Sequence, residues 1–144
     1  MSTVTMLHLL LAILRKDRES VPRFQANISL DGCPIIKGEH LLVMTSTLER
    51  LFLGMRPFWG KEVGALHYTA LATEPKCILR VILSLFLSRM RHHATPANGF
   101  FSHNVDHVQL EMEGDFTLDG ELYSAGEGLV TITPAGPINF LCSR

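Results

Sequence analysis

Two carboxylates flank a single glycine in the segment FTLDGELY, residues 116–123. Asp-Gly between alternating apolar residues is a strong signal for a two-residue β-hairpin turn, because glycine adopts positive φ without steric cost. The same residues could do chemistry, since carboxylates on a rigid turn can bind Mg²⁺ through water or accept a proton from a substrate hydroxyl. The two interpretations are compatible, because Gly120 could make the turn that aims Glu121.

The sequence does not support other catalytic motifs. The segment GMRPFWGK, residues 54–61, has one residue too many between its glycines for a P-loop, and Glu62 stands where Ser or Thr would bind magnesium. His103 and His107 have no Cys or carboxylate at the spacing of a metal site. There is no G-x-S-x-G elbow, and no cysteine stands near a histidine. We therefore predict no protein metal site and no nucleophilic triad.

Length and composition indicate one soluble globular domain. The chain has 144 residues, 47% hydrophobic and 19% charged, with a formal net charge of −1. This charge offers no field that would recruit nucleic acid or an anionic membrane. Two apolar runs, residues 6–14 and 78–87, are too short to span a bilayer. We expect a cytoplasmic protein without a nucleic-acid partner, and free thiols at the three cysteines, Cys33, Cys77 and Cys142.

The pattern of apolar residues predicts a β-rich α+β fold. Residues 1–23 are expected to form a helical segment, because leucines fill one side and Pro22 stops any continuation. Residues 24–144 are expected to form a β-sandwich domain on which this segment packs. Alternation in RFQANISLDG predicts a strand that ends in a turn at Asp31-Gly32. Long strand runs with only two helices favour an antiparallel β-sandwich over a doubly wound parallel sheet.

The other predicted elements follow in order. A second strand is expected over residues 38–47, joined to the first by the connection DGCPIIKG, and a third over residues 65–72. The second helix is expected over residues 73–93, with Thr73 as its N-cap. Residues 94–104 are interpreted as a loop, and four or five short strands complete the chain.

This order of elements resembles the C-terminal half of the diacylglycerol kinase and sphingosine kinase superfamily, which includes the bacterial lipid kinases. Members pair an N-terminal nucleotide-binding α/β domain with a C-terminal antiparallel β-sandwich. The resemblance covers nearly all of this chain and about half of a kinase. Its counterparts here are TMLHLLLAIL, ANISLDG, EHLLVMTST, GMRPFWGKEVGALHYTALA, PKCILRVILSLFLSRM, FTLDGELY and LVTITPAGPINFL.

The resemblance implies roles for three residues of the turn. In the family the Asp-Gly-Glu turn reaches toward the interdomain cleft, so Asp119 and Gly120 would help to place nucleotide and metal, and Glu121 would be the general base for the lipid hydroxyl. ATP and Mg²⁺ are the implied cofactors of a complete enzyme. The implied partners are a lipid substrate and a nucleotide-binding domain, in cis or in trans, with peripheral contact at the inner face of the membrane. We expect no cofactor and no activity for this chain alone, because the GGDGT nucleotide motif is absent.

The sequence departs from the family at two further places. Thr45-Ser46 stands where members commonly have Asn-Gly after the second strand, and Val63-Gly64 stands where they commonly have Asp-Gly before the third. Two other functions stay open. A non-catalytic module could bind a lipid or a protein through the sandwich or the loop around Trp59, and a structural domain could form a homodimer through its first helix.

Overall fold

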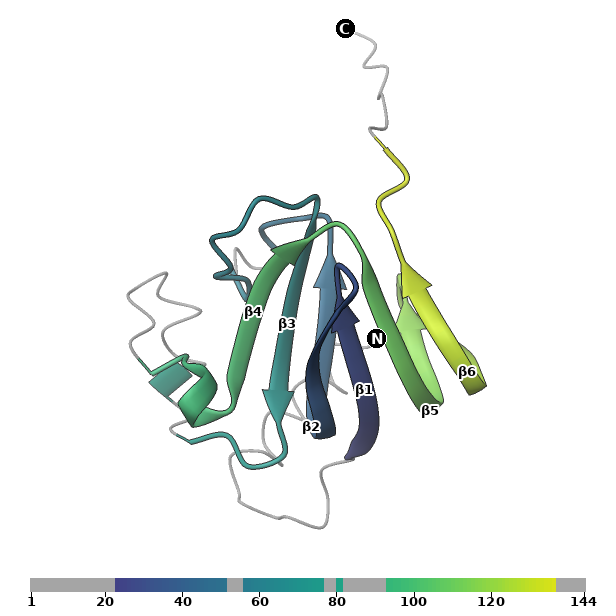
Figure 1. The fold of residues 1–144 in the computed structure, drawn as a ribbon, viewed down its shortest axis with the longest axis horizontal. Coiled ribbons are helices and arrows are strands. Elements are labelled where there is room, and N and C mark those ends of the chain that lie inside the picture. Colours follow the sequence, from purple (N-terminus) through teal and green to yellow (C-terminus); the bar gives the residue numbers. More distant parts are fainter. Residues whose placement is uncertain (1–22, 52–55, 77–79, 82–92, 137–144) are drawn as a thin grey trace, which may run out of the picture.

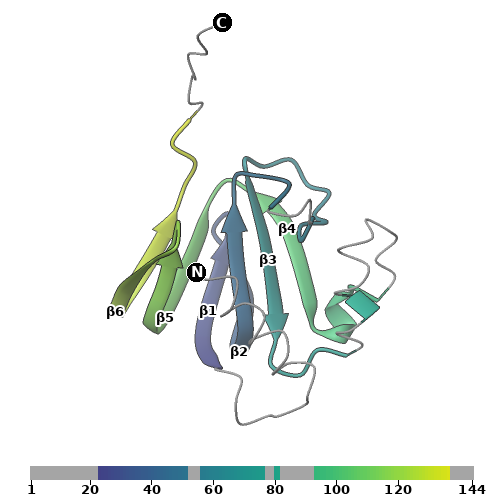
Figure 2. The same ribbon diagram turned by 180° about the vertical axis from the view of Figure 1, so that it is seen from behind.

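A single six-stranded antiparallel sheet makes up most of the structure. The computed structural model describes residues 23–51, 56–76, 80–81 and 93–136 (Figure 1). The strands lie in the order β4-β3-β2-β1-β5-β6, and Figure 2 shows the same sheet from behind. Their bounds are β1 Phe24–Leu30, β2 Cys33–Ser46, β3 Leu66–Ala72, β4 Phe100–Val105, β5 Val108–Leu118 and β6 Glu121–Ile132, and a short 3₁₀ helix, η2, covers Pro96–Asn98.

The prediction of a β-rich, antiparallel fold is confirmed. The two predicted helices lie mainly outside the described residues. The predicted helical segment 1–23 lies outside the described residues, apart from Arg23. Most of the predicted helix 73–93 also lies outside them, and only Arg80 and Val81 are helical in its described part. Within the described ranges, no helix is long and apolar enough to cross a membrane.

The short link between β4 and β5 forces the sheet to curl. Only Asp106 and His107 separate the two strands, a link that spans at most about 11 Å between Val105 and Val108. Three strands lie between β4 and β5 in the sheet order, which in a flat sheet would put them about 19 Å apart. The sheet must therefore bend so that the end of β4 lies close to the start of β5, where Figure 1 shows the link at the top.

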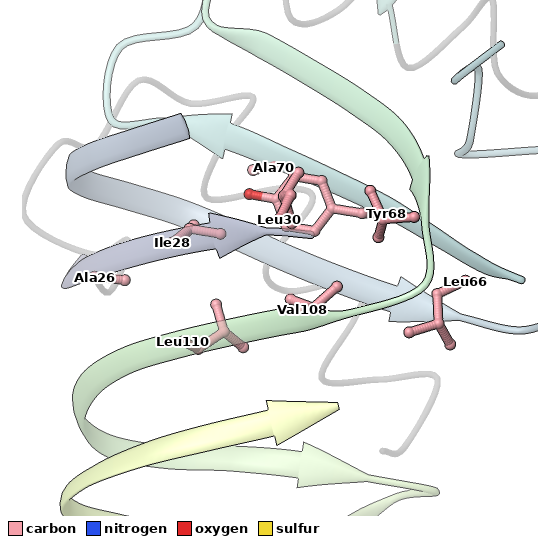
Figure 3. Close-up of a cluster of buried hydrophobic side chains, with 9 residues drawn as sticks. Ala26, Ile28, Leu30, Leu66, Tyr68, Ala70, Val108 and Leu110 are labelled. Atoms are coloured by element: carbon pink, nitrogen blue, oxygen red, sulfur yellow. The ribbon is translucent and has the colours of Figure 1, made fainter. Parts of the chain in front are cut away.

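The bend encloses the hydrophobic core on one side of the sheet, here called the inner face. The core draws on β1, β3, β5 and the last residue of β4, and its one buried aromatic side chain is Tyr68, whose phenol lies among the aliphatic side chains (Figure 3). Fully burying one such aliphatic side chain is worth about 1.5–3 kcal/mol. The buried members are Ala26, Ile28, Leu30, Leu66, Tyr68, Ala70, Val105, Val108 and Leu110.

Strand lengths differ from prediction in three places. β2 already begins at Cys33, because Asp31-Gly32 alone makes the turn and the expected connection DGCPIIKG continues the ladder with β1. The expected loop 94–104 contains β4, an edge strand whose polar residues conceal its alternation. Among the described residues the final strands are two long ones, β5 and β6, because a bulge beyond Gly114 keeps their pairing continuous where glycines suggested breaks. The last expected strand, residues 137–142, lies outside the described residues.

A loop between β2 and β3 covers the exposed edge of β4. Gly60 and Gly64 lie so close to the β4 backbone that a Cβ would be 2.6 Å from the Asn104 nitrogen and 2.3 Å from the Val105 nitrogen, respectively. The Glu62 carboxylate accepts the Asn104 N–H and contacts His103 Nδ1 at 2.8 Å. A hydrogen bond from the backbone of Glu62 itself, followed by those from the His103 side chain and the Asn104 backbone, lowers the pKa of Glu62 to about 2, and the charge of His103 contributes least. The loop thus occupies hydrogen-bonding groups of an edge strand that could otherwise pair with another chain.

His40 is buried on the inner face of β2 without a hydrogen bond. Its side chain is 1% exposed, and neither ring nitrogen has a partner among the described residues. Burial lowers the pKa of His40, an effect partly offset by the backbone of Ala26 and Leu71. The fold therefore holds this ring in its neutral form.

We expect the free energy of unfolding to fall as the pH drops below about 6.5, the ordinary pKa of histidine in an unfolded chain. The unfolded chain then binds a proton that folded His40 does not, so stability falls by up to about 1.4 kcal/mol per pH unit until the lowered folded pKa is reached. Urea unfolding at pH 5.5 and pH 7.5 measures the difference. His40→Leu should reduce this pH dependence, and an unchanged dependence in that variant would contradict the assignment.

Candidate functional site

The Asp119-Gly120 turn joins β5 to β6 at the tip of a long hairpin. Asp119 has φ of 50° and Gly120 has φ of 91°, and Leu118 pairs directly with Glu121. Positive φ at both central residues is the geometry of a type I′ turn, whose twist matches that of the flanking strands. The predicted hairpin turn is therefore confirmed, and Glu121 is the first residue of β6.

A second Asp-Gly turn in the same chain shows what such a turn does when its role is structural. Asp31 also has a positive φ, 49°, and its Oδ1 accepts the backbone N–H groups of Asp106 at 3.0 Å and His107 at 2.8 Å. Its own N–H donates to the His107 carbonyl oxygen at 3.0 Å. Asp31 thereby ties the β1–β2 turn to the β4–β5 link. Among the described residues, the Asp119 carboxylate makes no comparable hydrogen bond, so the fold leaves it available.

Tyr123 orients the Glu121 carboxylate. The Tyr123 hydroxyl donates to Glu121 Oε2 at 2.9 Å, and its ring stacks on Phe116 with centroids 5.8 Å apart. The hydrogen bond to Glu121 raises the pKa of Tyr123, with smaller effects from burial and from Asp119, so the phenol remains a donor at neutral pH. Tyr123 is not among the residues that the sequence motifs indicate. The period of two along a strand could have indicated it, because residues 121 and 123 share one face.

The turn lies at the end of the hairpin that is farthest along the ladder from β1. β1 pairs with β5 only as far as Met112, so β6 is the only described strand that pairs with residues 113–118 of β5. Every residue from Thr117 to Ser124 is exposed. In Figure 1, β5 runs down to the lower right and turns back there, so its arrowhead, which leads into the turn, points up again beside β6. The carboxylates of Asp119 and Glu121 are therefore accessible to a ligand or another domain.

The tip fits a shared metal and nucleotide site better than a self-contained one. Carboxylate oxygens are suitable ligands for Mg²⁺, and Asp119 and Glu121 supply two carboxylates within three residues. No cluster of three or more His, Cys, Asp or Glu side chains in the described ranges could hold a metal ion. An ion at this turn would therefore take its other ligands from nucleotide phosphates, water or another domain.

A small cavity at the opposite end of the sheet contains a well-positioned histidine. Asn104 Nδ2 donates to the carbonyl oxygens of Gly60 and Glu62, so its Oδ1 is the atom that meets His67 Nδ1 at 2.7 Å. An amide oxygen only accepts, so neutral His67 carries its hydrogen on Nδ1 and its lone pair on Nε2. The cavity has a volume of about 170 Å³ and is lined by Glu49, Arg56, Phe58, Gly60, His67 and Asn104. The structure does not bring it together with the Asp119 turn.

One residue at each departure from the family pattern, Ser46 and Gly64, has a structural role here. Ser46 Oγ accepts the N–H of Leu48, which ends β2, while the buried Thr45 hydroxyl has no partner among the described residues. Val63 is 102% exposed, and Gly64 packs against the β4 backbone. Gly64 is thus explained by its close approach to the β4 backbone, which leaves no room for a side chain. Nothing in the structure explains Val63.

Comparisons with known proteins connect this fold to one class. No protein-family model matches the sequence, and no curated protein matches it. The chain is similar to a crystal structure from Bacillus anthracis str. Sterne that is provisionally described as a diacylglycerol kinase. The two are 18% identical with a TM-score of 0.51, over 86% of this chain and 40% of that one. A diacylglycerol kinase structure from the same strain is 16% identical with a TM-score of 0.47, over 81% of this chain and 40% of that one.

The chain thus spans about two fifths of the length of these proteins. Its fold is that of part of a diacylglycerol-kinase structure, which confirms the fold that the sequence resemblance implied.

Proposed function

We propose that this chain is the lipid-side domain of a diacylglycerol-kinase-like protein. Joined to a nucleotide-binding domain in cis or in trans, it would take part in transfer of the γ-phosphoryl group of ATP to a lipid hydroxyl. The observation that carries the proposal is the contrast between the two Asp-Gly turns. The Asp31 carboxylate is held by hydrogen bonds of the fold, whereas Asp119 and Glu121 are exposed at the turn between β5 and β6. The likeness of fold to part of a structure described as a diacylglycerol kinase supports the proposal.

The arrangement at the turn suits proton transfer. The Tyr123 hydroxyl occupies Oε2 of Glu121 and leaves Oε1 to accept the proton of an acceptor hydroxyl. The deprotonated oxygen would attack the γ-phosphorus in line, and the bond to the β-phosphate would break to release ADP. Mg²⁺ bound with ATP would offset the charge that develops on the phosphates. Asp119, on the same turn, would help to place the nucleotide and its metal.

A chimera tests the proposal directly. This chain would replace the matched two fifths of the Bacillus anthracis protein, and transfer from ATP to diacylglycerol or sphingosine in mixed micelles would be measured with and without Mg²⁺. We expect Mg²⁺-dependent transfer by the chimera and by the parent protein, and none by this chain alone. An inactive chimera beside an active parent would count against the proposal. If lipid vesicles also quenched Trp59 fluorescence in this chain, the non-catalytic binding module would be favoured.

A further inference from the structure

The part of the hairpin next to the turn has a strand edge that no described strand covers. Ala26 pairs with Met112, and β1 begins two residues earlier at Phe24, so the position beside residues 115–118 of β5 is vacant among the described strands. The two-residue turn makes Leu118–Glu121 a hydrogen-bonded pair, and the pairs then alternate along the ladder. The N–H and C=O groups of Asp115 and Thr117 therefore point to this vacant edge.

Side chains along this edge alternate in character. Phe116 and Leu118 lie on the inner face, where Tyr123 is their neighbour, and Leu118 is 57% exposed. Glu113 and Asp115 lie on the outer face and are exposed. A groove of about 700 Å³ opens where β1 begins. It is lined by Arg23, Phe24, Gln25, Ala26, Asn27, Glu111, Met112, Glu113 and Gly128.

Charge is distributed very unequally along the chain. Residues 106–136 contain seven Asp or Glu and no Lys or Arg, whereas the remainder contains seven Asp or Glu and thirteen Lys or Arg. The acidic residues of this segment are Asp106, Glu111, Glu113, Asp115, Asp119, Glu121 and Glu127. A strand that paired with the vacant edge would lie in this negative electrostatic field. A strand with basic side chains would therefore be attracted to it.

We propose that the edge of β5 from Asp115 to Leu118 binds an extended segment of a partner polypeptide in which basic and apolar residues alternate. Backbone hydrogen bonds to Asp115 and Thr117 add it to the sheet as a further strand. Its basic side chains meet Glu113 and Asp115 on the outer face, and its apolar side chains cover Phe116 and Leu118 on the inner face. The same edge of a second copy is a poor occupant, because its carboxylates would lie opposite those of the first. This proposal does not depend on kinase activity.

Two proline variants of the complete chain test which edge is used. Thr117 and Leu122 are directly paired, but by ladder geometry the N–H of Thr117 points to the vacant β5 edge and that of Leu122 to the outer edge of β6. Proline removes the N–H without breaking a bond between β5 and β6 at either position. The probe is a short, acetylated and amidated peptide of alternating lysine and valine. We expect Thr117→Pro to weaken its binding about tenfold or more and Leu122→Pro to leave it nearly unchanged, because of these two residues only Thr117 donates to the added strand.

Amide hydrogen exchange of the unmodified protein gives a second measurement that requires no variant. The peptide should protect the amides of Asp115 and Thr117 and leave those of Leu122 and Ser124 unprotected. A peptide of alternating glutamate and valine should not bind. The proposal is overturned if the lysine peptide does not bind, if it protects the β6 edge instead, if the two proline variants behave alike while folded, or if the glutamate peptide binds equally well.

Discussion

Glu121→Gln in the chimera is expected to slow phosphoryl transfer by about 10²–10⁴-fold, the usual contribution of a positioned general base. Glutamine keeps the size of the side chain and can still accept the hydrogen bond from Tyr123, but it cannot take a proton from the acceptor hydroxyl. The loss should therefore appear mainly in kcat, with little change in the KM for lipid. Initial rates over a range of lipid concentrations separate the two constants.

Glu111→Gln is the matched control for this experiment. Glu111 is an exposed carboxylate on the same hairpin, and its Oε2 accepts a hydrogen bond from Asn27 that glutamine can also accept. Its rate should stay close to that of the unsubstituted chimera. A Glu121→Gln chimera as fast as the Glu111→Gln chimera would exclude the general-base role, although the fold relationship would stand.

Asp31→Gly is expected to lower the free energy of unfolding by about 2–4 kcal/mol, because it removes a charged acceptor of two backbone N–H groups. Glycine adopts the positive φ of this position without strain, so the substitution isolates the loss of the carboxylate. The effect should be large because these hydrogen bonds join the β1–β2 turn to the link that bends the sheet. Equilibrium unfolding in urea measures it.

Asp119→Gly is the matched substitution at the other turn. Its backbone has nearly the same φ, 50° against 49°, but its carboxylate makes no hydrogen bond with the described residues. We expect a change within about 0.5 kcal/mol, as for other surface positions. Equal losses at the two turns would show that Asp119 also serves the fold, and would remove the main support for a functional tip.

The sequence was most informative where local chemistry decides the structure. Asp-Gly at 31–32 and at 119–120 predicted both tight turns, because positive φ is a property of the residues themselves. Alternation of apolar and polar residues predicted β1, and the expected strand 65–72 contains all of β3. Alternation failed at β4, whose Ser102 is buried by contacts that come from distant segments. Ser102 Oγ accepts the N–H groups of Trp59 and Gly60, and its hydroxyl donates to the Tyr68 carbonyl oxygen.

By itself, the sequence determined the strand-rich fold, the two turns and the pair of carboxylates at residues 119 and 121. Only the tertiary structure separated the two Asp-Gly turns by role. The curl of the sheet brings Asp106 and His107 to Asp31. By contrast, β1 begins only at Phe24, so the tip of the hairpin has no neighbouring described strand. Local residue preferences shape a turn, but what its carboxylate meets depends on contacts between residues far apart in the chain.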